Sequence, residues 1–184
     1  MPARTHVRPK LLLGLAVAAL LTLGLVGAAE ASSAAPRAAG ADWSSTDPVP
    51  PEIQVPPGNQ LAAQLNAWGV QIYQCTAGAW AFLEPAAHLA DWGQTAIHFR
   101  GPSWESTQDG SLVEARVVAS SPVAGSIPQL LLQATRTRGD GIFGHVTYIQ
   151  RLNTTGGVKP TTACTDGQTQ GVPYTAQYRF YVQS

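Results

Sequence analysis

Charged side chains are scarce in this sequence. Lys, Arg, Asp and Glu make up 12% of its 184 residues, and eleven basic residues balance eleven acidic ones. A neutral chain has no overall field that attracts a polyanion, which argues against nucleic acid and anionic membrane surfaces as partners. The scarcity does not indicate disorder, because 45% of the residues are hydrophobic. Length and composition together predict a single folded domain.

Charge is absent altogether from a long apolar run at residues 11–29, which follows a basic segment at residues 1–10. This order predicts a secretory signal peptide over residues 1–31, cleaved at small residues between Ala29 and Ala35. The run approaches the length that spans a bilayer, so an uncleaved anchor is the alternative. Residues 32–48 have almost no large apolar side chains and predict a disordered linker. We therefore expect a secreted protein whose folded domain covers residues 49–184 and has no membrane contact once the leader is removed.

Cysteine is almost absent, since only Cys75 and Cys164 occur. In an exported protein two cysteines predict one disulfide. A free catalytic thiol is the alternative hypothesis. No neighbour of either cysteine has the chemistry that would activate a thiolate, so the disulfide is the preferred prediction.

Helical periodicity is also nearly absent after the leader, whereas apolar and polar residues alternate repeatedly between clusters of Gly, Pro, Asn and Asp. The clearest alternation runs from Tyr174 to Val182, and residues 85–92 are the only candidate for a short helical turn. The pattern predicts an all-β fold, an antiparallel β-sandwich or barrel of about eight to ten short strands with at most one short helix.

Three strand segments receive more detailed predictions. In residues 61–72 the apolar positions change from odd to even numbers around Gly69, which predicts a β-bulge there. Leu130–Thr137 and Ile142–Leu152 flank a Gly-rich turn at residues 138–141 and predict a hairpin. Arg151 then faces away from Tyr148 and Leu152, on the polar side of its strand.

Several segments resemble one known family, DUF3455, and together they cover nearly all of the expected domain in the right order. They are Gly69–Cys75, His98–Glu105 with Asp109–Ser111, Ile127–Leu132, Ile149–Gly157 and Val172–Ala176. The resemblance implies a secreted bacterial or fungal protein of unestablished activity. It also implies that Cys75 and Cys164 pair, because they fall at the family's cysteine positions. This chain departs from the family at Ser103, where Thr is common, and at Gln129, where an aromatic residue is common.

The densest group of reactive side chains lies between His98 and Ser111. His98 can act as a general base if Asp109 or Glu105 orients it, which gives a hydrolase-like hypothesis. The structural alternative is that Asp109 belongs to an ordinary Asp-Gly turn and His98 bonds a backbone carbonyl. No two histidines have a metal-ligand spacing, so the sequence predicts no metal site and no cofactor.

A binding function is the other hypothesis and the preferred one. Trp104 can contact a sugar ring or an apolar ligand, and Arg151 can capture a carboxylate or hold a loop carbonyl. We therefore expect a monomeric extracellular or cell-surface binding module for a glycan or a small apolar molecule.

Overall fold

A computed structural model describes residues 48–184; the expected leader and nearly all of the expected linker lie outside them. The described residues form one short 3-10 turn and eight strands. These elements are η1 (Pro51–Ile53), β1 (Asn59–Thr76), β2 (Ala79–Asp91), β3 (Gln94–Phe99), β4 (Ser103–Ser106), β5 (Leu112–Ser121), β6 (Gln129–Arg138), β7 (Val146–Gly156) and β8 (Thr169–Gln183). No helix in this part of the chain is both long and apolar enough to cross a membrane.

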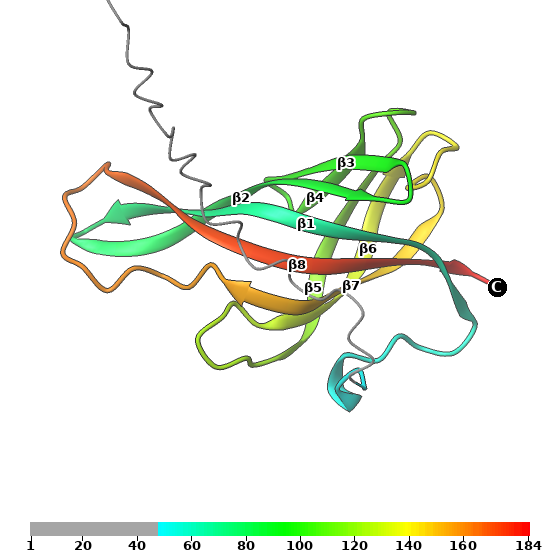
Figure 1. Cartoon of the computed structure of the whole chain (residues 1–184), viewed down its shortest axis with the longest axis horizontal. Coiled ribbons are helices and arrows are strands. Elements are labelled where there is room, and N and C mark those ends of the chain that lie inside the picture. The colour runs from blue at the N-terminus through cyan, green and yellow to red at the C-terminus, as the bar shows by residue number, and fades with distance from the viewer. Residues whose placement is uncertain (1–47) are drawn as a thin grey trace, which may run out of the picture. The chain divides into compact units, whose positions relative to one another are not determined.

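The strands form one closed barrel in which each strand pairs antiparallel with its neighbours in sequence and β8 pairs with β1 (Figure 1). The predicted antiparallel all-β fold is confirmed, and a barrel is the form that the chain adopts. Closure depends on bends in the sheet, and the register shifts in the β1–β8, β5–β6 and β7–β8 pairs supply them.

Two tight turns place β1, β2 and β3 next to one another. Ala77 and Gly78 join β1 to β2, and Trp92 and Gly93 join β2 to β3; all four have positive φ. Two successive residues with positive φ give the turn whose twist matches that of paired antiparallel strands. The chain therefore reverses sharply at both points and keeps β1, β2 and β3 side by side.

The helical turn predicted for residues 85–92 is wrong, because this segment forms the second half of β2 and the start of the next turn. Pro85 and Leu89 are buried while Ala86 and His88 are exposed, which is the alternation of a strand. Pro85 is tolerated because the β2–β3 ladder begins only at Ala87. Pairing with two neighbours overrides the helix-favouring composition of this segment.

The inward face of β1 follows one continuous alternation, which corrects the predicted change of phase. Its buried members all have odd numbers, and they are Leu65, Ala67, Gln71, Tyr73 and Cys75. Val70 and Ile72 consequently lie on the outward face. The barrel interior therefore receives an amide and a phenol from a segment where the sequence suggested two aliphatic side chains.

The bulge predicted at Gly69 is also wrong. The register of β1 shifts between Leu61 and Ala63 against β8, and between Ile72 and Tyr73 against β2. Gly69 has a different role, because a Cβ at this position would overlap the backbone of the facing β2 residues Ala86 and Ala87. The glycine allows β1 and β2 to approach closely.

One end of the barrel is filled by side chains. Phe143, from the connection between β6 and β7, is fully buried, and its ring lies 4.6 Å from that of Phe180. The hairpin predicted around residues 138–141 forms, but β7 begins at Val146 rather than at Ile142. The longer connection carries Phe143 into the core, and the other end of the barrel remains less filled.

Candidate functional site

A cavity of about 470 Å³ lies inside the barrel, at the end bounded by the β3–β4 turn and the β5–β6 connection. This volume is in the range of small-molecule sites. Most of its wall is apolar or aromatic. The apolar and aromatic lining residues are Tyr73, Phe82, Leu83, Pro85, Pro102, Trp104, Val117, Ile127, Pro128, Leu130, Leu132 and Tyr178.

Three rings form the floor of the cavity. His98 and Trp104 are cross-strand partners on β3 and β4, and their rings stack 4.3 Å apart with an angle of 5° between the planes. Tyr178 of β8 meets both rings edge-on, at 5.3 and 5.4 Å. Beyond them, Trp104 lies 6.1 Å from Phe180 of the filled end. The aromatic layer therefore separates the cavity from the packed core.

The imidazole of His98 is neutral. Its Nδ1 lies 2.8 Å from the carbonyl oxygen of Ser103. A carbonyl can only accept, so Nδ1 carries the proton and Nε2 carries none. Burial lowers the pKa of His98 to about 3, which outweighs the opposing effect of the Ser103 carbonyl. A histidine in this state is an acceptor and a ring surface at neutral pH.

Arg151 lines the cavity from β7, between its pairing partners Leu130 of β6 and Tyr178 of β8. Its Nε and Nη2 donate to the carbonyl oxygen of Pro128 at 3.1 and 2.9 Å. Its positive charge also acts on the phenols around it. Burial raises the pKa of Tyr73 and of Tyr178, and the guanidinium of Arg151 opposes the rise in both.

The three side chains proposed for catalysis, His98, Glu105 and Asp109, do not converge on one place. His98 and Trp104 meet at the cavity, as described above. Glu105 is the β4 neighbour of Trp104 and points to the other face of the strand, where Arg138 donates to it at 2.8 Å. Asp109 accepts from the backbone N–H groups of Ser111 at 2.8 Å and of Ile142 at 3.2 Å.

Asp109 therefore ties the β4–β5 turn to the connection between β6 and β7. Hydrogen bonds from the side chain and the backbone N–H of Ser111 lower the pKa of Asp109. Ser111 in turn accepts at Oγ from the backbone N–H of Phe143, 3.0 Å away. This arrangement positions Phe143 in the core and gives the carboxylate a structural role.

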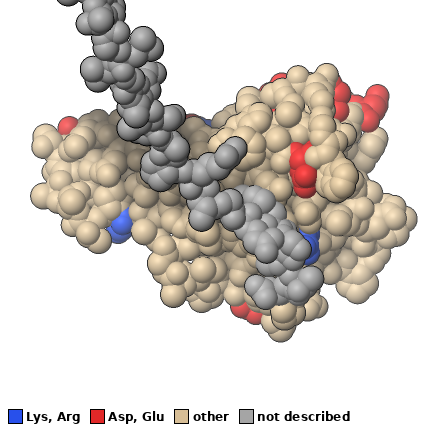
Figure 2. Space-filling view, in the orientation of Figure 1, with Lys and Arg blue, Asp and Glu red and all other residues tan. Residues whose placement is uncertain are grey.

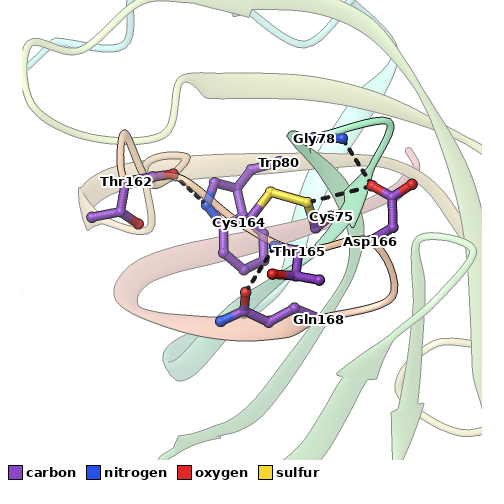
Figure 3. The surroundings of a disulfide bond; sticks show 8 residues. All are labelled: Cys75, Gly78, Trp80, Thr162, Cys164, Thr165, Asp166 and Gln168. Carbon is purple, nitrogen blue, oxygen red and sulfur yellow. Dashed lines mark hydrogen bonds between the residues drawn. A yellow bond between two sulfur atoms is a disulfide. The ribbon is translucent and has the colours of Figure 1, made fainter.

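A second buried group lies beyond the open end of the barrel, around the disulfide between Cys75 and Cys164 (Figure 3). The predicted pairing is confirmed. The ring of Trp80 lies beside the two sulfur atoms, and its Nε1 donates to the carbonyl oxygen of Thr162 at 3.0 Å. Asp166 accepts from the backbone N–H of Gly78 at 2.8 Å. The β1–β2 hairpin and the β7–β8 connection are thereby joined (Figure 1).

The same connection is also held at the cavity. The hydroxyl of Tyr73 donates to the carbonyl oxygen of Gly157 at 2.7 Å, and both groups are buried. A Cβ at Gly157 would press on Tyr174, Gln71 and Ile127, so the backbone here must come close to the wall. The connection is therefore fixed at its start by Tyr73 and further along by Cys164.

Three residues of the site were not among the sequence candidates. Gln71 and Tyr73 were missed because the predicted change of phase in β1 turned them outward. Tyr178 was correctly predicted to share the apolar face of its strand, but an aromatic residue in such a pattern indicates packing and gives no sign of a cavity.

The described residues form no metal centre, and the face shown in Figure 2 carries no basic patch. Within residues 48–184, no three His, Cys, Asp or Glu side chains gather in a way that could hold an ion. Lys and Arg side chains stand singly on the face shown in Figure 2.

Residues 92–182 match the model of the family described as "Protein of unknown function (DUF3455)". No curated protein and no solved structure matches the chain.

Proposed function

Because the chain belongs to the DUF3455 family, whose description assigns no function, we propose from the geometry of the barrel that this protein binds a small, largely apolar molecule. The cavity of about 470 Å³ within the barrel is the observation that carries the proposal. A ligand there would exchange water for contact with apolar walls, which favours binding in proportion to the area removed from water.

An apolar ligand fits this wall better than a glycan does. Sugar recognition by stacking needs an accessible aromatic face, but Trp104 is 1% exposed, and its ring stacks on His98 and meets Tyr178 and Phe180 edge-on. The exposed indoles, Trp68 and Trp92, lie outside the cavity lining. The sequence suggested two ligand classes, a glycan and a small apolar molecule, and we propose the second.

The hydrolase hypothesis receives less support from the same geometry. A general base needs a proton affinity near the working pH and a partner that orients it. The His98 ring has a strongly lowered pKa, and its Nδ1 is held by the Ser103 carbonyl. Glu105 and Asp109 are bonded elsewhere.

A fluorescent apolar probe tests the proposed function. N-phenyl-1-naphthylamine, a neutral dye whose emission rises in apolar surroundings, should bind the wild-type protein with saturation. Val117→Trp places a large ring on the cavity wall and should weaken binding by at least about tenfold, because it occupies ligand volume.

Ile97→Trp is the matched control, since Ile97 is 42% exposed and Val117 50% exposed, but Ile97 does not line the cavity. The control should bind the probe like the wild type. Absence of probe binding to the wild type, or equal loss in both variants, would overturn the proposal.

The proposal also places the protein outside the cytoplasm. The apolar run at residues 11–29 and the disulfide between Cys75 and Cys164 support this location, because disulfides persist mainly in oxidising compartments. Mass spectrometry of the protein from the native host's culture medium should find a chain that begins between residues 30 and 36. An intact N-terminus on cell-associated protein alone would contradict secretion.

A further inference from the structure

The wall of the cavity contains three buried polar groups without a well-formed hydrogen bond in the described part of the chain, and one of them, Tyr178, interacts electrostatically with Tyr174 and Arg151. The three groups are Nε1 of Trp104, Nε2 of Gln71 and the hydroxyl of Tyr178. Each residue is at most 3% exposed, and each lines the cavity. A buried polar group without a hydrogen bond costs about 1 to 3 kcal/mol, so three such groups on one wall require a reason.

The chemistry of these atoms defines the missing partner. The indole N–H of Trp104 and the amide N–H₂ of Gln71 can only donate, and the phenol of Tyr178 donates as readily as it accepts. All three can therefore be satisfied together by a group that accepts several hydrogen bonds. An alkane or an ammonium group cannot accept from the two groups that only donate.

The charge on the cavity wall further restricts the chemical class of the ligand. Arg151 lines the same cavity and is absent from the three ion pairs found among the described residues. Its two bonds to the Pro128 carbonyl use Nε–H and one N–H of Nη2, out of the five that a guanidinium offers. The other cationic residue on the wall, Arg100, is paired with Glu84 at 3.0 Å. Arg151 therefore supplies a positive charge to the cavity that no carboxylate of the described chain neutralises.

From these two observations we propose that the ligand is an amphiphilic monocarboxylate, with its carboxylate on the Arg151, Gln71 and Tyr178 side and its apolar body along Leu130 and Leu132. The inference rests on the proposed function, since it names the ligand class of the same cavity. A carboxylate accepts several hydrogen bonds and neutralises the positive charge of Arg151. The apolar body replaces water along the β6 wall.

Displacement of bound N-phenyl-1-naphthylamine by decanoate and by 1-decanol at pH 7 tests the proposal, because the two competitors share a tail and differ in the head group. The wild type should prefer decanoate by roughly tenfold or more, as expected for hydrogen bonds to a charged group. Arg151→Met should abolish the preference, and Arg151→Lys should retain part of it. Arg179→Met is the control, because Arg179 lies on β8 outside the cavity and bonds Gln64.

Tyr178→Phe is a second test of the carboxylate proposal, which still applies if the Arg151 variants fail to fold. It removes one hydroxyl and keeps the ring, so the dye should bind as before while decanoate binds less tightly. Equal displacement by decanoate and 1-decanol in the wild type would overturn the carboxylate proposal and leave the apolar binding function standing. The carboxylate proposal would also be overturned if Arg151→Met and Tyr178→Phe both kept the full preference for decanoate over 1-decanol. If the dye does not bind the wild type at all, the proposed function fails together with this inference.

Discussion

The ring of His98 lies between Trp104 and Tyr178 and is almost completely buried. Burial lowers its pKa to about 3, whereas an unfolded histidine has a pKa of about 6.5. Between these values the unfolded chain binds a proton that the native chain does not. The free energy of unfolding therefore falls as the pH falls from about 6.5 towards about 3, by up to about 1.4 kcal/mol per pH unit from this group.

His98→Asn should reduce this dependence, because the amide can still donate to the Ser103 carbonyl but does not titrate. Urea unfolding at pH 4, 5, 6 and 7 measures the slope for each variant. His145→Asn, at an exposed residue, should keep the wild-type slope. An identical slope in His98→Asn and the wild type would show that His98 is accessible to protons in the folded state.

Individual residues also show where sequence patterns fail. Asp109 was a candidate for catalysis because a carboxylate near a histidine in sequence suggests a pair. Its oxygens instead accept from Ser111 and Ile142, which are separated by a β-hairpin. The turn alternative weighed from the sequence foresaw the Asp-Gly turn, but not the bond to a distant connection. Contacts of that kind depend on the closed barrel and have no local pattern.

Among the elements, β8 and β1 differ most in how well their sequences predict them. In β8, Tyr174, Ala176, Tyr178 and Phe180 are all buried, as their alternation predicts. In β1 the aliphatic Val70 and Ile72 point outward and the polar Gln71 points inward. A cavity with polar groups on its wall requires this inversion, so the pattern fails at the candidate site and holds in the packed core.

The disulfide fixes the connection between β7 and β8 to the end of β1. Cys75 and Cys164 are 89 residues apart, and a loop of this length stabilises by roughly 4 to 5 kcal/mol in the chain-entropy description. Cys75→Ala with Cys164→Ala should lower the free energy of unfolding by about that amount, and urea unfolding measures it. Hydrogen exchange should also rise in residues 157–168 more than in β5 and β6.

The two readouts of the disulfide variant have different meanings. A loss below about 1 kcal/mol would contradict the entropic contribution. Unchanged exchange in residues 157–168 would show that Trp80, Asp166 and Tyr73 hold the connection without the covalent bond.

For the whole domain, the sequence predicts the class of fold but does not determine whether the sheet closes into a barrel. Alternation and turn residues indicate antiparallel strands equally well in a sandwich and in a barrel. Closure depends on the pairing of β1 with β8, which joins Asn59–Gln74 to Thr169–Gln183 across most of the domain. No local pattern encodes a partner at that distance, and the cavity exists only because the sheet closes around it.

The central claim is that the unfilled end of the barrel binds a small apolar molecule. The most direct test is a nuclear Overhauser spectrum of the isotope-labelled protein with bound N-phenyl-1-naphthylamine. We predict contacts from the dye to Leu130, Leu132 and Trp104, which line the cavity. Contacts confined to the exposed outer side chains Trp68 and Ile97 would contradict it.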